Sequence, residues 1–204
     1  TGQTSNSQIS FAKIAIGKNA PELINNEAEN IKLLTEIKLD SIVFPAIISQ
    51  SDEHLQISDI SSEVRSNQLT GIHRFALKEL DHKTSTCRGL KYAEFFSALT
   101  ENVSSVNHLD NIKIPKAMGR KLQWILDSFS SNEEVDLSYA HGDFTPWNCY
   151  LSETKLAVYD LEMGQTLMPR GFDAFHFIIQ NGILVERISW SKICDKIYET
   201  VTPL

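Results

Sequence analysis

The chain begins with alternating apolar and polar positions and then changes to a helical spacing. The segment 9–16 reads Ile-Ser-Phe-Ala-Lys-Ile-Ala-Ile, and its alternation predicts a β-strand. Asn19 followed by Pro21 and Glu22 is typical of a helix start, with a capping residue, a proline in the first turn and an acid three residues after the cap. The helix expected there carries one apolar stripe at helical spacing: Ile24, Ala28, Ile31 and Leu34.

Strand-like segments follow this helix, and a polar connector separates them from the rest of the chain. Residues 41–49 form one apolar, strand-like run in which Pro45 indicates an edge or a bulge. Residues 55–57 form a shorter strand-like run. Residues 58–67 are polar and poor in helix formers, which favours a connector between two lobes.

Beyond residue 69 helical spacing predominates, so we expect a mainly helical second half. A short alternating strand at 135–139 precedes a turn-rich segment, and the runs 148–151 and 155–159 predict a β-hairpin that turns at 152–154. After Asp173 an apolar run predicts a buried helix. Three further apolar stripes belong to expected helices: Leu69, Ile72, Ala76 and Leu80; Phe95, Phe96 and Leu99; Met118, Leu122, Leu126 and Phe129.

Composition narrows the classes of partner. The 204 residues suit one domain or two lobes that share a cleft, and 42% apolar residues are enough for a sizeable core. The net charge of −7 and the absence of a basic run argue against nucleic acid or an anionic membrane surface as the main partner. No segment approaches the roughly 18 apolar residues of a membrane-spanning helix. Three widely spaced cysteines favour a reducing compartment, so we expect a cytoplasmic protein.

The turn-rich segment carries the residues with chemical potential. It reads His-Gly-Asp-Phe-Thr-Pro-Trp-Asn from His141 to Asn148, and Asp160 ends the second strand of the predicted hairpin. The hairpin returns Asp160 to the side of Asn148, so two oxygen ligands lie together with the carboxylate of Asp143 nearby. Mg²⁺ binds one or two protein carboxylates and leaves its other positions to water and phosphate. Ordinary turns use the same residue types, and this is the alternative interpretation of the segment.

Protein kinases use the same order of groups: an Asp at the accepting hydroxyl, then an Asn and a later Asp on Mg²⁺. The segments 141–148, 159–162 and 170–177 resemble the aminoglycoside phosphotransferase and choline kinase family of small-molecule kinases. The resemblance implies an α+β, protein-kinase-like fold of two lobes. Residues 1–60 would form a small β-rich, nucleotide-binding N-lobe that is incomplete at its start. Residues 61–204 would form a larger, mainly helical C-lobe with the catalytic loop, the metal site and the acceptor pocket.

The resemblance assigns nucleotide binding to the first third of the chain. Lys13 would pair with the phosphates of ATP beneath a polar loop that contains Gly2, although a lysine on a solvated strand face is the alternative. Glu27 would be the partner of Lys13, and Glu29 is its competitor because an acidic helix usually has a solvated face. The backbone of three residues would bind the adenine: Ser58, Asp59 and Ile60.

The resemblance assigns catalysis and metal binding to the turn-rich segment and the hairpin. Asp143 would be the general base or the group that orients the accepting hydroxyl, and Asn148 and Asp160 would hold Mg²⁺. Glu162 follows Asp160 by two positions, so a metal role, a substrate role and a solvated side chain all stay open.

Three further residues have supporting or open roles. His141 would orient the loop rather than transfer a proton, and Asp173 would be its buried partner, fixing the tautomer of the ring. Trp147 departs from the small or charged residues common at that place in the family. It would either pack the loop or form a wall of the substrate pocket.

The implied function is an ATP-dependent phosphotransferase that moves the γ-phosphate to a hydroxyl of a small molecule, an amino sugar, an amino-alcohol or a sugar. A kinase-like nucleotide-binding module without catalysis is the alternative, against which the intact set Lys13, Asp143, Asn148 and Asp160 argues. A metal-dependent hydrolase should show a histidine-rich ligand set, and only His141 is near.

The charge around the expected pocket favours one class of acceptor. Acidic residues crowd the segment from Asp143 to Asp173, and a negative cleft concentrates cations and repels anions. We therefore expect a neutral or cationic alcohol rather than a phosphorylated or carboxylated one. Basic residues of the second lobe could reverse this field if they line the pocket: Arg88, Lys91 or Arg170.

Overall fold

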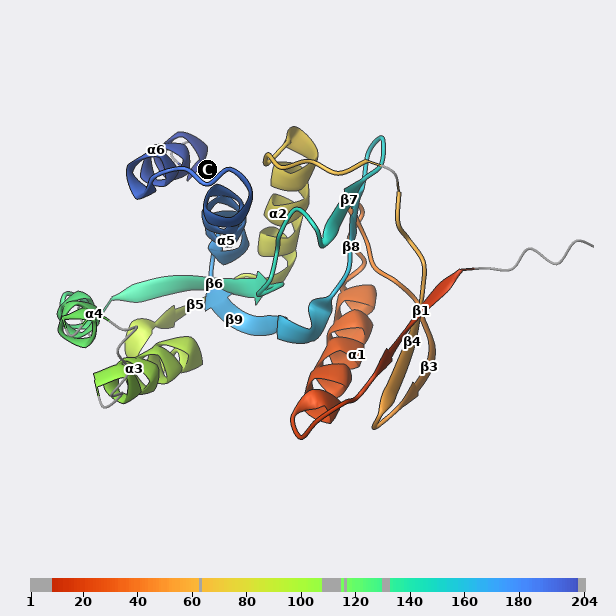
Figure 1. Ribbon diagram of the computed structural model, residues 1–204, viewed down its shortest axis with the longest axis horizontal. Coiled ribbons are helices and arrows are strands. Elements are labelled where there is room, and N and C mark those ends of the chain that lie inside the picture. The colour runs from red at the N-terminus through yellow and green to blue at the C-terminus, as the bar shows by residue number, and fades with distance from the viewer. Residues whose placement is uncertain (1–8, 63, 108–114, 116, 130–132, 202–204) are drawn as a thin grey trace, which may run out of the picture.

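The computed structural model describes residues 9–62, 64–107, 115, 117–129 and 133–201 (Figure 1). Gly2 lies outside the described residues. Three small sheets alternate with helices along the described chain, so the α+β class expected from the sequence is confirmed. Within the described residues, no helix combines the length and the apolar character needed to cross a membrane.

The first sheet is a small antiparallel sheet near the start of the chain. Strand β4 (His54–Ser58) lies between β1 (Ser10–Ile14) and β3 (Ile47–Ser51), and its residues Leu55 and Ile57 are buried. Because alternate residues of a strand point to opposite faces, this sheet has one apolar face, and helix α1 packs against it (Figure 1). The strand predicted at 9–16 is confirmed as β1.

Helix α1 (Ala20–Ile37) begins where the sequence predicts. Asn19 is the N-cap residue and Pro21 lies in the first turn, where its missing N–H costs no hydrogen bond. The whole predicted apolar stripe of this helix is buried. Two polar residues of the helix, Glu27 and Asn30, are buried as well, and both contribute to the site described below.

The single strand-like run predicted at 41–49 is wrong, because the chain divides there between two sheets. Strand β2 (Ile42–Val43) pairs in parallel with β8 (Leu156–Val158), and β8 pairs antiparallel with β7 (Cys149–Leu151). Pro45 is buried between β2 and β3, and it has no N–H with which to continue a ladder of hydrogen bonds. The predicted hairpin is confirmed as β7 and β8, and β2 joins it to the first part of the chain.

The second half of the described chain combines one antiparallel sheet with helices. Strand β6 (Glu134–Ala140) lies between β5 (Thr86–Gly89) and β9 (Gln165–Pro169). The sequence predicted neither β5 nor β9, since both are short and neither shows a clear apolar alternation. Helices α2 and α5 both lie above β6 in Figure 1, and α2 contacts this strand. The helical elements are α2 (Gly71–Thr84), η1 (Leu90–Tyr92), α3 (Glu94–Asn107), α4 (Met118–Asp127), η2 (Leu161–Met163), α5 (Phe172–Gln180), the π-helical η3 (Asn181–Val185) and α6 (Trp190–Val201).

One histidine of helix α2 is buried in the core, next to Phe144. His73 of α2 is 1% exposed, and its ring contacts the rings of Phe144 and Phe177 at centroid distances of 6.1 and 5.4 Å. Its Nδ1 accepts a hydrogen bond from the backbone N–H of Thr70 at 3.2 Å, which closes a capping box at the start of α2. Burial lowers the pKa of His73 from 6.5 to about 4, so the ring is neutral in the folded protein at pH 7.

This buried histidine should make the protein sensitive to acid. Because the folded-state pKa is depressed, His73 contributes stability above pH 6.5 that is lost as the pH falls through 4, and the full contribution is about 3 kcal/mol. Urea unfolding between pH 4 and 7 should therefore show a shallower pH dependence for His73→Gln than for the wild type. His82→Gln, at an exposed position of the same helix, is the control. Equal pH dependence of His73→Gln and the wild type would contradict the prediction.

Candidate active site

A sharp turn after β6 forms the loop His141–Asn148, which carries the candidate catalytic residues. Gly142 has a φ of 81°, in the left-handed region that favours glycine. A Cβ atom added there would overlap the backbone carbonyl group of Met163 in η2. Because backbone cannot move aside as a flexible side chain can, only glycine lets the loop pack against η2, which directly follows Asp160.

Asp173, in the first turn of α5, holds the backbone of this loop. Its Oδ2 accepts a hydrogen bond from the N–H of His141 at 2.8 Å, and its Oδ1 accepts one from the N–H of Gly142 at 3.1 Å. The side chain is buried, with 4% of the residue exposed. The expected contact between Asp173 and the ring of His141 is thus corrected: the carboxylate binds backbone N–H groups of the loop.

The ring of His141 is oriented by other groups. Its Nδ1 accepts the N–H of Asp143 at 3.2 Å, and its Nε2 lies 2.7 Å from the backbone oxygen of Tyr159. This pair of contacts requires the tautomer with its hydrogen on Nε2. Burial lowers the pKa of His141, which keeps the ring neutral. His141 therefore joins the loop to the strand that leads to Asp160, consistent with an orienting role.

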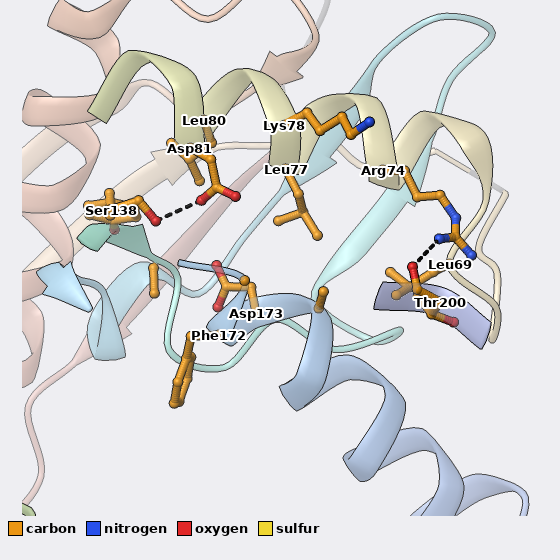
Figure 2. Close-up of a pocket in the computed structure, with 14 residues that line it drawn as sticks. Leu69, Arg74, Leu77, Lys78, Leu80, Asp81, Ser138, Phe172, Asp173 and Thr200 are labelled. Atoms are coloured by element: carbon orange, nitrogen blue, oxygen red, sulfur yellow. Dashed lines mark hydrogen bonds between the residues drawn. The ribbon is translucent and has the colours of Figure 1, made fainter. Parts of the chain in front are cut away.

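A small cavity of about 40 Å³ lies behind the loop, between α2, β6 and α5 (Figure 2). Asp81 of α2 and Asp173 of α5 point into the same space, and Ser138 of β6 donates a hydrogen bond from its Oγ to Asp81 at 2.6 Å. Burial raises the pKa of Asp173 to about 7, the N–H groups of His141 and Gly142 oppose that rise, and Asp81 adds to it. A cavity of this size has room for about one water molecule, so we assign it no ligand.

Asp143 and Asn148 contact each other within the loop. The side-chain amide of Asn148 donates to the backbone oxygen of Asp143 and to its Oδ2, both at 3.0 Å. The N–H of Tyr159 donates to the backbone oxygen of Asn148 at 3.0 Å, so the hairpin does bring the segment before Asp160 beside Asn148, as the sequence predicted.

The other oxygen of Asp143 has a partner that sequence reasoning missed. Nε2 of His176 lies 3.0 Å from Oδ1 of Asp143. His176 follows Asp173 by three positions on α5, which places both residues on the helix face that the loop covers. That spacing was a usable signal in the sequence.

Lys13 and three acidic groups form a second cluster, beside the loop. Nζ of Lys13 lies 2.6 Å from Oε2 of Glu27, contacts Asp160 directly, and lies 3.3 Å from Oε2 of Glu162. The pairing of Lys13 with Glu27 is as predicted, whereas Glu29 is exposed. Burial works to lower the pKa of Lys13, but the carboxylates of Glu27 and Asp160 outweigh it, so the pKa is raised and the lysine stays charged.

The three acids of this cluster fit a divalent cation. Carboxylate oxygens of Glu27, Asp160 and Glu162 lie within 4.8 Å of one another. Glu27 is fully buried, and burial raises its pKa against the opposing effect of Lys13. Side chains of Asp160 and Glu162 are about one-third exposed and can reach a ligand. Hard oxygen donors of this kind, with room left for water and phosphate, suit Mg²⁺.

Helix α1 holds the segment after Asp160 through two asparagines that the sequence analysis did not single out. Nδ2 of Asn30 donates to the backbone oxygens of Leu161 and Gly164, each at 3.0 Å. Asn26, one turn earlier, donates to the backbone oxygen of Glu162 at 2.6 Å. Asp160 itself has a φ of 64°, a conformation rare for a residue other than glycine. These bonds offset the strain and fix the direction of the two acids.

The backbone expected to bind adenine is engaged within the chain. The N–H of Asp59 donates to the backbone oxygen of Ile9 at 3.1 Å. The N–H of Ile60 donates to the hydroxyl of Tyr159, which in turn donates to Oδ1 of Asp59 at 2.7 Å. The ring of Tyr159 also contacts the ring of Phe11, at a centroid distance of 5.9 Å. The residue before Asp160 therefore reaches the connector that follows β4. Ser58, the third predicted position, ends β4 and is buried.

Comparison with known proteins shows the fold and not the activity. No protein-family model and no curated protein matches the sequence. Among solved structures, a ternary complex of APH(2″)-IIa with streptomycin and ATP matches 83% of this chain, with a TM-score of 0.57 and 16% identity. ADP-bound aminoglycoside phosphotransferase APH(2″)-Ib gives a TM-score of 0.56, 16% identity and 83% coverage of this chain. A macrolide 2′-phosphotransferase type I gives 0.61, 13% and 87%.

The chain spans about two-thirds of the length of these proteins, 64% of the first two and 65% of the third. The fold is therefore the protein-kinase-like fold of small-molecule phosphotransferases, as the sequence motifs predicted. At identities of this level the roles of single residues are not transferred by the comparison, and they depend on the geometry above.

Removal of the Asp173 carboxylate should loosen the loop. Asp173→Ala leaves the N–H groups of His141 and Gly142 without an acceptor, and each buried unpaired donor costs about 1–3 kcal/mol. Asp173→Asn keeps one acceptor oxygen and should lose less. The measurement is the free energy of unfolding in urea.

The same two variants test the ionisation of this group. Because the folded-state pKa of Asp173 is raised from 3.8 to about 7, the wild type should lose stability relative to Asp173→Asn as the pH rises from 4 through 7. A difference in stability that stays constant over this interval would contradict the raised pKa.

Proposed function

We propose that this chain carries the active site of an ATP-dependent phosphotransferase that moves the γ-phosphate to a hydroxyl of a small molecule. One observation supports this most: a loop carboxylate, Asp143, and a Lys–acid cluster around Asp160 are joined by the short hairpin that follows Asn148. Phosphoryl transfer asks for positioning and charge neutralisation rather than covalent chemistry, and this arrangement supplies both.

Each residue has a role in the proposed reaction. Lys13 binds nucleotide phosphates and is itself positioned by Glu27, which is buried and cannot turn away. Asn148 and Asp160 would hold Mg²⁺, with Glu162 as a further oxygen donor beside Asp160. When bound, the metal neutralises charge on the phosphates. Asp143 accepts the proton of the attacking hydroxyl or orients that hydroxyl toward the phosphate.

Nucleotide binding involves the connector after β4. A base that uses the N–H of Ile60 displaces the hydroxyl of Tyr159, because one N–H makes one strong hydrogen bond. Ser58 and Asp59 supply the neighbouring backbone groups. Three of the similar solved structures contain a nucleotide: ATP in one, ADP in another, and GDP in the kanamycin complex of APH(2″)-IIIa. The test therefore uses both ATP and GTP.

The acceptor is a neutral or cationic alcohol, such as an amino sugar, an amino-alcohol or a sugar. Lys13 is in contact with three carboxylates, those of Glu27, Asp160 and Glu162, and Asp143 adds a fourth, so acidic groups outnumber the lysine and favour a negative field at the site. Two of the basic residues that could reverse it have contacts elsewhere: Arg170 lies 3.4 Å from Asp136, and Lys91 lies over the ring of Tyr92.

The two other classes receive less support. A nucleotide-binding module without catalysis has no need of Asp143, yet this carboxylate is held by contacts to both of its oxygens. A histidine-rich hydrolase site is not supported either, because the metal-ligating group found among the described residues consists of carboxylates only.

The proposal is tested by nucleotide consumption with a panel of amino-alcohols, aminoglycosides, neutral sugars and their phosphorylated forms. Wild type should turn over a neutral or cationic member in the presence of Mg²⁺. Asp143→Asn should lower kcat by about 10²- to 10⁴-fold while nucleotide still binds, because the group at the hydroxyl is lost. Asp136→Asn, at an exposed position of the preceding strand, is the control. Near-normal turnover of Asp143→Asn would remove this residue from its role.

Metal dependence provides a separate test. Asp160→Ala should weaken binding of Mg·ATP more than binding of metal-free ADP, because a carboxylate faces a divalent ion. Asn148→Ala should have the same effect in weaker form, since an amide offers only a dipole. Asp127→Ala at the distant end of α4 serves as the control (Figure 1). Calorimetry that gives equal affinities with and without Mg²⁺ for the wild type would favour the non-catalytic module.

A further inference from the structure

The two oxygens of the Asp143 carboxylate contact two different side chains. Oδ2 accepts a hydrogen bond from the amide of Asn148 at 3.0 Å, and Oδ1 lies 3.0 Å from Nε2 of His176. Asn148 belongs to the loop itself, whereas His176 belongs to α5. The orientation of the Asp143 carboxylate is therefore fixed in part by a helix outside its own loop.

The ring of His176 is itself fixed. Phe172, four positions earlier on α5, stacks on it with a centroid distance of 6.0 Å and an angle of 20° between the rings. Only 19% of the His176 side chain is exposed. A ring that is stacked on one face and largely buried has little freedom, so the direction of its Nε2 is set by packing.

The same helix holds the backbone of the loop. Asp173 binds the N–H groups of His141 and Gly142, and His176 lies one turn further along the same face. Backbone and side chain of the loop are thus positioned by one element. A displacement of α5 would move both, whereas the loss of His176 alone would free only the carboxylate.

Packing alone does not account for this placement. A side chain that only fills space beside Phe172 needs no polar atom, and burying the imidazole costs free energy unless it is hydrogen-bonded. Its Nε2 faces a carboxylate oxygen, which only accepts, so the hydrogen of the ring is on Nε2. Each carboxylate oxygen keeps a further lone pair for an incoming hydroxyl.

We propose that His176 is a positioning residue for the phosphoryl-acceptor step, donating its Nε2 hydrogen to Oδ1 of Asp143 and holding the carboxylate in the orientation that meets the acceptor hydroxyl. This role rests on the proposed function. Among the described residues, the side-chain contacts of His176 are with Asp143 and Phe172 and not with the cluster around Lys13, so we expect its effect on kcat and not on nucleotide affinity.

Kinetics of matched variants test this role. His176→Ala should lower kcat by about 10- to 100-fold with the KM values for nucleotide and acceptor within about twofold, because a misplaced group loses transition-state stabilisation only. His176→Gln places an amide donor near the position of Nε2 and should recover most of the activity. His176→Leu fills space without a donor and should not. His82→Gln, exposed at the end of α2, is the control.

Three kinetic results would overturn the proposal. Unchanged kcat in His176→Ala would show that Asp143 needs no partner on α5. Equal activity of the Gln and Leu variants would show that packing, and not the donor, matters. A rise in the KM for the acceptor alone would assign His176 to acceptor binding. Thermal unfolding of each variant separates these results from loss of the fold.

NMR spectroscopy tests the role of His176 even if the wild type turns over no member of the panel. That kinetic result would contradict the proposed function. The ¹⁵N NMR signals of His176 should show a hydrogen on Nε2. In Asp143→Ala this preference should weaken and the Nε2 hydrogen should exchange faster with solvent. Identical signals in the wild type and Asp143→Ala would show that the two side chains do not interact in solution, and the positioning role would be wrong.

Discussion

The buried carboxylate of Asp173 determines the conformation on which the candidate site depends. A charge taken out of water costs several kcal/mol, and two N–H donors from consecutive residues of the loop offset that cost. The same two bonds satisfy backbone donors that the sharp turn at Gly142 would otherwise leave unpaired. The loop and the start of α5 are therefore mutually dependent: neither is satisfied without the other. Asp143 and Asn148 lie in the loop that this junction holds.

Helix α1 provides the corresponding support around Lys13 and Asp160. One face of the helix carries Glu27 toward Lys13, and Asn26 and Asn30 toward the backbone that follows Asp160. A positive φ at Asp160 would be unfavourable in isolation, and the bonds from the helix compensate for it. A movement of α1 would shift Glu27 and the backbone that follows Asp160 together. The charge balance and the geometry of the cluster around Lys13 therefore both depend on helix α1.

The hairpin β7–β8 links these two supports. It is short, but β2 extends it by parallel pairing, and His141 and Tyr159 bond across its base. Tyr159 also bonds to the connector after β4, so this connector is linked to the residue next to Asp160. This connectivity explains why residues far apart in the chain, from Lys13 to His176, act on one small volume.

The sequence by itself determined many of the local elements and indicated the candidate site residues. Local patterns of apolar and polar residues indicate secondary structure directly. Examples are the apolar stripe of α1, the alternation in β6 and the turn residues of the hairpin. The order of Asp143, Asn148 and Asp160 indicated the chemistry because a hairpin of known length returns the chain to its start. Predictions of this kind depend on neighbours within about twenty residues.

The tertiary structure decided which groups meet across the fold. The division of residues 41–49 between two sheets depends on a partner strand more than a hundred residues later, so no local pattern could show it. The contact of Asp173 with backbone N–H groups, rather than the ring of His141, follows from where α5 begins in space. His176, Asn26 and Asn30 are polar residues on helices, where sequence alone cannot separate a solvated face from a buried contact. Their partners lie in other elements, and only packing brings those elements together.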